Sequence, residues 1–385
     1  MNKPSYIIPS MADIRALPWN GFTVASTFSG CGGSSLGYRL AGFKVGYANE
    51  FVEEARNTYR ANCSLETFVD GRDIRAVTAD DIFAKLGMQP GELDLFDGSP
   101  PCASFSTAGS RAKGWGRVKT YSDTMQRTDD LFYEYSRLLR GIRPKTFVAE
   151  NVSGLVKGVA KGYFLDILKE LKTCGYRVSA RVLNAAWLGV PQARQRLIFV
   201  GVRDDLGIDP VHPKPLPYCY TVRDALPHLR SVVHDTSGNR SAGEVIDRPC
   251  PTITVGGQQT AACHFKVEAE ADITGTAIGR EWDRMGRPGT QSEKYFQLVR
   301  PALDRPCPTI TATAGQTGAA GVTHPTERRK FSIAEVKALS GCPADFVLTG
   351  TYRQQWERLG RCVPPVMMSH IAAAVRDGVL RRIKR

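Results

Sequence analysis

A short apolar segment that ends abruptly before a cysteine constrains the fold of this chain more than any other feature. Residues 93–96 are typical of a buried strand, and residues 97–101, Asp-Gly-Ser-Pro-Pro, are expected to end it. Because Pro100 and Pro101 fix φ and donate no backbone hydrogen bond, the segment that leads to Cys102 is stiff and cannot continue a sheet. Open α/β sheets bind ligands at the carboxyl ends of their strands, so we predict that Cys102 lies at such an edge.

A segment near the N-terminus predicts a binding site for a nucleoside. Residues 22–28 have the β-branched and aromatic character of a strand, and the glycine-rich residues 29–35 precede a helical pattern. This layout lets backbone amides approach a cofactor. A second predicted strand, residues 45–50, ends in Glu50, an acid of the kind that binds ribose hydroxyls. Ser35 stands where the dinucleotide fingerprint has its third glycine, so the turn does not indicate NAD.

Two further strands bring polar side chains to the same kind of edge. Residues 146–152 predict a strand that ends at Glu150 and Asn151, and a helix is expected around residues 163–173, stopped by Gly175. Residues 191–200 predict a strand that presents three polar side chains on one side, at alternate positions: Gln192, Arg194 and Arg196.

Residues 103–128 show no apolar periodicity and are rich in glycine and in cationic residues. We interpret this segment as a lid whose cations grip a phosphate backbone, with a disordered loop as the alternative. Residues 128–130, Thr-Asp-Asp, then predict the start of a helix with Leu131 on its core face.

Composition narrows the functional class. The 385 residues allow a large core and two domains, and the net charge of +13 favours a polyanionic partner, with nucleic acid ahead of a membrane surface. Ten cysteines without a Cys-x-x-Cys pair argue against a zinc site and a disulfide framework, so we expect no metal. No segment resembles a membrane span or a signal peptide, and we expect a cytoplasmic protein.

The strand–helix alternation breaks down near Arg203, where prolines become frequent. We predict a catalytic and cofactor-binding domain at residues 1–202, a second, β-rich domain at 203–345 and a C-terminal segment at 346–385. An internal repeat lies in the second domain: residues 247–254, Asp-Arg-Pro-Cys-Pro-Thr-Ile-Thr, recur as residues 304–311. Two copies are too few for a solenoid and predict two equivalent strand–turn units.

These motifs, in this order, resemble those of the DNA (cytosine-5)-methyltransferases over nearly the whole chain. The matches are the Phe-x-Gly-x-Gly-Gly turn at 28–33, Pro-Cys at 101–102, Glu-Asn-Val at 150–152, Gln-x-Arg-x-Arg at 192–196 and Gly-x-x-Val-Pro-Pro at 360–365. The resemblance implies a Rossmann-like, S-adenosylmethionine-dependent methyltransferase fold with a smaller target-recognition domain. It further implies a target cytosine flipped out of double-stranded DNA and methylated at C5.

The resemblance also implies roles for individual residues. Cys102 would add as thiolate to C6, Glu150 would hydrogen-bond the N3/N4 edge, and Arg194 and Arg196 would hold the base O2 and the carboxylate. The implied cofactor-binding residues are Phe28, Ser29, Gly30, Cys31, Gly33, Asn49, Glu50, Phe51, Asp73, Ile74, Pro101, Leu131, Arg361 and Cys362. The expected DNA-binding residues are Ser104, Arg111, Lys113, Arg117, Lys119 and Gln192. We expect a monomer of bacterial or phage origin, with a restriction endonuclease as a possible companion.

One position departs from the family pattern. The last motif has asparagine where this chain has Arg361, near the methionine end of the cofactor by resemblance. A guanidinium about 6 Å from the sulfonium would oppose binding by roughly 3 kcal/mol at an effective dielectric of 20. One hypothesis is therefore a donor with an extra carboxylate, carboxy-S-adenosylmethionine, which would give 5-carboxymethylcytosine. The alternative is that Arg361 turns outward, or pairs with the cofactor's own carboxylate, and the donor is ordinary.

Three other functions stay open at this point. An RNA cytosine-5 methyltransferase would share the catalytic motifs, but the long region between residues 196 and 359 favours duplex DNA. A non-catalytic DNA-binding regulator would be expected to lack the cysteine or the glutamate, and both are present. A Rossmann oxidoreductase would not need the Pro-Pro-Cys turn.

Overall fold

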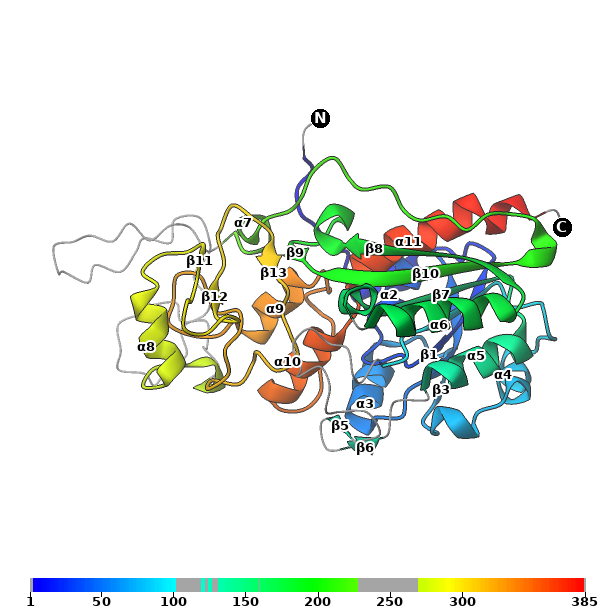
Figure 1. Cartoon of the computed structure of the whole chain (residues 1–385), viewed down its shortest axis with the longest axis horizontal. Coiled ribbons are helices and arrows are strands. Elements are labelled where there is room, and N and C mark those ends of the chain that lie inside the picture. Colours follow the sequence, from blue (N-terminus) through cyan, green and yellow to red (C-terminus); the bar gives the residue numbers. More distant parts are fainter. Residues whose placement is uncertain are drawn as a thin grey trace.

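The computed structural model describes residues 3–101, 119–121, 124–126, 131–158, 160–227 and 269–383. Figure 1 shows a large sheet covered by helices and, beside it, a smaller lobe that contains α7 to α10. No helix in these ranges is long and apolar enough to cross a bilayer.

The large sheet has seven strands, and the order of five of them is that of a doubly wound fold. In spatial order they are β3 (Phe68–Asp70), β2 (Lys44–Asn49), β1 (Thr23–Thr27), β4 (Leu95–Gly98), β7 (Thr146–Val152), β10 (Gln195–Arg203) and β8 (Tyr176–Asn184). The first five are parallel, and β10 is antiparallel to both of its neighbours. The order reverses between β1 and β4, where such sheets bind their ligands. The predicted Rossmann-like fold is confirmed.

Helices cover both faces of the sheet, and successive strand residues point to opposite faces. On one side α2 (Gly33–Leu40) and α11 (Pro365–Gly378) pack on residues such as Val24 and Val148. On the other side α4 (Ala79–Leu86), α5 (Leu131–Ile142) and α6 (Ala160–Thr173) pack on Ala25 and Phe147. Because both faces are buried, the strands are almost continuously apolar, as the sequence shows.

The remaining elements are short. They are α1 (Met11–Ala16), α3 (Glu53–Asn62), β5 (Lys119–Tyr121), β6 (Thr124–Gln126), β9 (Gln192–Ala193), α7 (Val222–Ala225), α8 (Ala277–Arg284), β11 (Thr290–Gln291), β12 (Val299–Arg300), β13 (Cys307–Pro308), α9 (Ile333–Leu339) and α10 (Tyr352–Arg361), with 3-10 turns at Ile74–Ala76, Ser153–Val156, Ala185–Leu188, Asp204–Leu206, Ala269–Ala271 and Leu380–Arg382. The helix predicted at residues 163–173 begins three residues earlier than expected.

Strand β4 is shifted by two residues from its prediction, since it begins at Leu95 and continues through Asp97 and Gly98. Asp97 remains in the buried strand because two hydroxyl groups donate to its carboxylate. A Cβ at position 98 would lie 2.5 Å from the ring of Tyr135, so only glycine fits there. The expected strand terminators are therefore part of the sheet, and the chain leaves it at Ser99.

The second lobe has its own apolar cluster, which includes residues of α9 and α10. Because Tyr352, Trp356 and Leu359 of α10 belong to this cluster, the predicted domain end at residue 345 divides it. The described part of the lobe contains strands of only two residues, so it holds more helix than the predicted β-rich domain. In the second copy of the repeat, β13 pairs with β9; the first copy, residues 247–254, lies outside the described residues.

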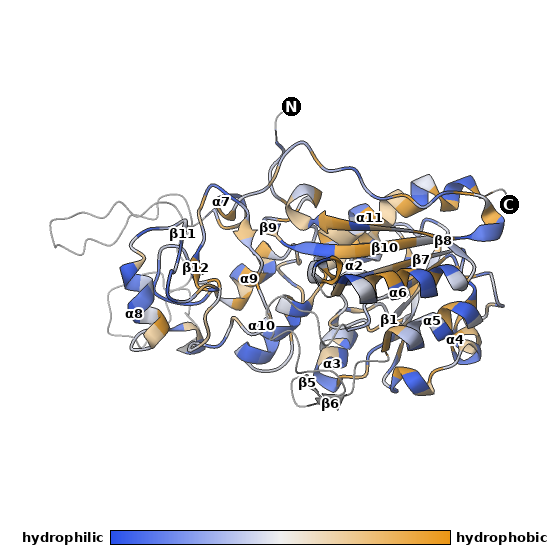
Figure 2. Ribbon diagram, viewed as in Figure 1, coloured by the Kyte–Doolittle hydropathy of each residue, from blue (hydrophilic) through white to orange (hydrophobic). Residues whose placement is uncertain are grey.

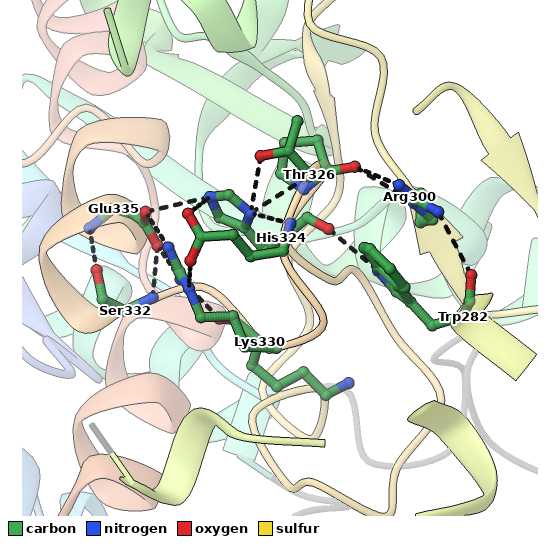
Figure 3. Close-up of polar contacts among 10 residues, drawn as sticks. Trp282, Arg300, His324, Thr326, Lys330, Ser332 and Glu335 are labelled. Carbon is green, nitrogen blue, oxygen red and sulfur yellow. Dashed lines mark hydrogen bonds and ion pairs between the residues drawn. The ribbon is translucent and has the colours of Figure 1, made fainter. Parts of the chain in front are cut away.

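A polar network also stabilises this lobe (Figure 3). The guanidinium of Arg300 lies 3.6 Å from the ring centroid of Trp282, whose indole nitrogen donates to the carbonyl of His324. His324 Nδ1 accepts from the backbone of Glu327, and His324 Nε2 lies 3.4 Å from Glu335 Oε1. Side chains from three separate segments of the lobe thus meet in its interior.

Candidate active site

The turn after β1 has an unusual backbone and one open side. Phe28 and Gly30 have φ values of 52° and 55°, in the left-handed region that residues other than glycine rarely adopt. A Cβ at Gly30 would meet no atom within 4 Å, whereas one at Gly32 would lie 3.1 Å from the ring of Tyr59. Of these two glycines, Gly30 is the one that a ligand can approach.

Glu50 connects this turn to the segment after β2. Its Oε2 accepts from the backbone N–H of Gly30 at 2.7 Å, and its Oε1 accepts from that of Val52 at 2.8 Å. Burial raises the pKa of Glu50, and the two backbone hydrogen bonds and the guanidinium groups of Arg358 and Arg56 oppose that rise. A carboxylate therefore lies at the carboxyl end of β2, directly beside the open side of the turn.

Gly33 lies in a close contact with the C-terminal part of the chain. A Cβ at this position would lie 2.1 Å from Cys362 Sγ and 2.4 Å from the carbonyl oxygen of Val363. Gly33 therefore lets the last motif pack against the start of α2. Cys362 is buried in this contact, and the thiol of Cys31 donates to the carbonyl of Arg358. The C-terminal segment contacts the turn through these residues.

The other expected cofactor residues surround the same edge of the sheet. Asn49 donates to the carbonyl of Arg72. Asp73 accepts from the N–H of Arg75 and forms an ion pair with its side chain. Five more are partly or fully buried: Ile74 and Leu131 lie in the apolar cluster that includes α5, Ser29 lies in the turn, and Phe51 and Pro101 are half-buried.

The edge formed by β7 and β10 holds an ion pair. Arg196 Nε lies 2.7 Å from Glu150 Oε1. Burial lowers the pKa of Arg196, and the negative charge of Glu150 opposes that shift. The side chain of Asn151 donates to the carbonyl of Pro100, so the pair lies beside the segment that leads to Cys102. The structure thus brings Glu150 and Arg196 together, as the motifs suggested.

Gln192 and Arg194 are placed differently from the prediction. Each is 1% exposed. The guanidinium of Arg194 donates to the carbonyls of Ile310 and Gly360, and the amide of Gln192 donates toward Leu339 and Ser340. The strand is interrupted at Arg194, between β9 and β10, so the alternation assumed for one continuous strand does not hold. These two side chains connect the lobes, and the charges of Arg196 and Glu150 act on the buried Arg194 guanidinium, whose pKa burial lowers to about 9.

Several expected residues lie outside the described ranges: Cys102, Ser104, Arg111, Lys113 and Arg117. Lys119 begins β5, which pairs with β6, so the predicted loop contains a short hairpin.

Arg361 lies at the end of α10 with its side chain 42% exposed, and its Nε and Nη2 both lie 2.9 Å from Glu357 Oε1. Its charge therefore faces a carboxylate of its own helix.

Sequence reasoning missed Asp97 as a site residue. Its side chain is 1% exposed, and it accepts from Ser26 Oγ at 2.7 Å and from the hydroxyl of Tyr38 at 2.9 Å. Burial raises its pKa to about 7. An acid directly before Gly98 in an apolar segment was the available signal, and we interpreted it as part of a turn. In the described ranges no group of three or more His, Cys, Asp or Glu side chains could hold a metal ion.

Known proteins with similar sequences identify the family. The profile of the C-5 cytosine-specific DNA methylases matches residues 22–377. The chain belongs to this family. The Type II methyltransferase M.NgoPII of Neisseria gonorrhoeae is 28% identical over 94% of this chain and 98% of its own length. M.Sau96I of Staphylococcus aureus, also a Type II methyltransferase, is 28% identical over 97% of this chain and 80% of its own.

A solved structure confirms the fold. A DNA modification methyltransferase encoded within an Escherichia coli prophage superposes with a TM-score of 0.66, at 20% identity, over 94% of this chain and all of its own. Enzymes of this family use S-adenosylmethionine. The site fits that cofactor, because Gly30 borders open space at the sheet's reversal point and Glu50 places a carboxylate beside it.

Proposed function

We propose that this protein flips a cytosine out of double-stranded DNA and transfers a methyl group from S-adenosylmethionine to its C5 through a covalent adduct with Cys102. The observation that supports this best is the position of the Glu150–Arg196 ion pair. The pair lies next to Pro100, two residues before Cys102, and the cofactor turn follows the neighbouring strand β1.

The chain's residues divide the chemistry as follows. Cys102 Sγ, as thiolate, forms a bond to C6, which makes C5 an enamine carbon. Glu150, held by Arg196, hydrogen-bonds the N3/N4 edge as charge develops on the ring. Bound S-adenosylmethionine supplies an electrophilic methyl group. C5 then loses its proton to a base, and the C6–S bond breaks with its electrons returning to sulfur, so the thiolate is regenerated.

Glu50, Gly30 and the neighbouring turn would hold the adenosyl part of the cofactor. Glu50 lies beside the one open glycine of the turn, where a carboxylate can accept hydrogen bonds from ribose hydroxyls. Arg194 enters this scheme as a positioning residue, because its guanidinium holds the lobes together instead of the base.

The pairing of Arg361 with Glu357 supports the ordinary methyl donor. The hypothesis of carboxy-S-adenosylmethionine assumed that the carboxylate of the donor pairs with the Arg361 guanidinium. In the structure Glu357 of the same helix pairs with this guanidinium. The family and its Type II relatives support duplex DNA over RNA as substrate, and they support a place in a restriction-modification system.

A mechanism-based probe tests the proposal. Duplex DNA with 5-fluorocytosine at the target site cannot release its C5 substituent, so it should become cross-linked to Cys102 when S-adenosylmethionine is present. Mass spectrometry of the tryptic adduct would locate the bond, and Cys102→Ala should abolish it. Absence of a cross-link with active wild-type protein would exclude the covalent route. Incubation with both donors would show whether any carboxymethyl product forms.

A further inference from the structure

One buried carboxylate connects the two segments on which methyl transfer depends. Ser26 of β1 and Asp97 of β4 are direct partners in the register of the parallel strands. Ser26 Oγ donates to one oxygen of Asp97 at 2.7 Å, and the Tyr38 hydroxyl of α2 donates to the other at 2.9 Å. Ser29 Oγ in turn donates to Ser26 Oγ at 3.0 Å. A hydrogen-bonded chain therefore runs from Ser29 through Ser26 to Asp97.

Ser29 belongs to the turn whose conformation most needs support. Its neighbour Phe28 has a φ of 52°, and such a conformation persists only where the surroundings hold it. The Ser29 backbone N–H donates to the carbonyl of Asn49, and its side chain donates to Ser26. The Ser26 hydroxyl donates its proton to Asp97, so its oxygen is oriented to accept the hydrogen bond from Ser29.

Asp97, at the other end of this series of hydrogen bonds, lies on the segment that precedes the nucleophile Cys102. Thr27 Oγ1 donates to the backbone carbonyl of Asp97 at 3.2 Å, and Gly98 packs closely against Tyr135 and Thr27. Cys102 follows five residues after Asp97 through the stiff Pro100–Pro101 segment. The described segment from Asp97 to Pro101 therefore leads directly, along the sequence, to the nucleophile.

We propose that Asp97 is a positioning residue that fixes the cofactor turn relative to the strand that presents Cys102, and thereby sets the approach of the donor methyl group to C5. This inference rests on the proposed function. Asp97 touches neither substrate nor cofactor, and it acts through Ser26, Ser29 and its own backbone.

The surroundings of Asp97 disfavour its charged form. Asp97 is buried, and the charge of Glu150 also raises its pKa, against the opposing hydrogen bonds from Ser26 and Tyr38. The other titratable groups that face it are the phenols of Tyr38, Tyr59 and Tyr135, whose pKa values burial raises. These phenols stay neutral near pH 7, so they do not change charge where Asp97 does.

The decisive variant is Asp97→Asn, which keeps the size but accepts only one of the two hydroxyl protons. We expect its single-turnover rate of methyl transfer to fall about tenfold or more, because small misplacements of reacting groups have effects of that size. The Kd for S-adenosylhomocysteine, measured by calorimetry without DNA, should stay within threefold. The Tm should rise by about 2–4 °C at pH 8, because a buried charge is removed.

The same variant has a pH signature. In the wild type the transfer rate should fall as the pH drops below about 7, since a protonated Asp97 would have to donate to hydroxyls that already donate to it. Asp97→Asn should lack this limb. A wild-type rate in Asp97→Asn, or a loss of rate that parallels loss of Tm and of cofactor affinity, would overturn the proposal.

Three further variants keep the test sharp if Asp97 variants fold poorly. Ser26→Ala breaks the link to Ser29 and should slow transfer about fivefold or more, whereas Tyr38→Phe leaves that link intact and should change it less than threefold. The matched control is Ser136→Ala, a buried serine whose hydroxyl bonds within α5. Equal effects of Ser26→Ala and Ser136→Ala would contradict the proposal. If wild-type protein forms no cross-link at Cys102, the proposed function has failed, and that result is independent of these comparisons.

Discussion

The two lobes of this protein are stabilised by different kinds of interior. The sheet buries apolar side chains on both faces, and among the largest are Phe96, Phe147 and Phe199. The second lobe buries Arg300, His324 and Lys330 as well as its apolar cluster. Figure 2 shows hydrophobic residues along the strands of the sheet, whereas the ribbon around α8, β11 and β12 is mostly hydrophilic.

This difference predicts different responses to mutation and to pH. Apolar packing loses stability in proportion to the volume removed, and it is insensitive to protonation. A buried polar network depends on every partner, because one missing partner leaves a charge or a hydrogen-bonding group without compensation. The second lobe should therefore lose more stability than the apolar faces of the sheet lose when one buried polar partner is removed.

Phe147→Ala should have the largest effect on stability. Phe147 is fully buried between Tyr135 and Tyr176, so its removal leaves a cavity in the centre of the sheet. We expect a loss of about 3–5 kcal/mol in the free energy of unfolding, measured by urea denaturation, at both pH 6 and pH 8. A loss that differs strongly between the two pH values would contradict an apolar interior.

Glu335→Ala should destabilise the second lobe by about 3 kcal/mol, since Glu335 makes a two-pronged ion pair with Arg329 and faces His324. Hydrogen exchange followed by mass spectrometry should show faster exchange in α8 and α9 and unchanged exchange in β1, β4 and β7. S-adenosylhomocysteine should still bind with wild-type affinity. Equal loss of protection in both lobes would show that they unfold as one unit.

Lys330→Met should stabilise the protein at pH 7, in contrast to the first two variants. Lys330 is fully buried, its ammonium donates to the carbonyl of Ala319, and burial lowers its pKa to about 7 from 10.5. Between those values the unfolded chain binds a proton that the folded chain does not, so stability rises with pH. We expect a gain of about 1–3 kcal/mol at pH 7 and a smaller gain at pH 9.

The comparison for Lys330→Met is the urea denaturation midpoint at pH 7, 8 and 9. Lys294→Met, an exchange at a solvent-accessible lysine beside Tyr295, is a control that should leave the pH dependence unchanged. If Lys330→Met destabilised the protein at all three pH values, the hydrogen bond of the ammonium to Ala319 would contribute more to the free energy of unfolding than the burial of the charge removes.

Mild acid should produce the smallest effect. Burial lowers the pKa of His324 below its usual 6.5, and the carboxylate of Glu335 opposes that shift. The unfolded chain therefore gains a proton below pH 6.5 before the folded lobe does, and stability falls as the pH falls. One pH unit below 6.5 should lower the stability of the lobe by about 1 kcal/mol. His324→Gln should weaken this acid response of α8 and α9 in hydrogen exchange.

The sequence predicted the sheet better than it predicted the contacts between lobes. Strands such as β1 and β7 and helix α6 follow from the local residue pattern, because burial on two faces and helical spacing leave a local signal. The pairing of Glu150 with Arg196 follows from two motifs that end at the same edge. Nothing local shows that Arg194 donates to Ile310 and Gly360, because those acceptors are backbone atoms more than a hundred residues away.

Two local rules also misled the interpretation of particular residues. Asp97 and Gly98 look like a turn, yet hydroxyls from β1 and α2 make the acid acceptable inside β4. Gly33 looks like part of a ligand-binding turn, and its role became visible only through the contact with Cys362. In each case the deciding partner comes from another segment of the chain, which pattern and propensity do not report.

The contact between Gly33 and Cys362 has a consequence for biosynthesis. The first glycine-rich turn to emerge from the ribosome is packed by residues translated more than three hundred codons later. We expect nascent chains stalled before residue 360 to bind no S-adenosylhomocysteine, so that the enzyme acquires its methyl donor only when translation is nearly finished.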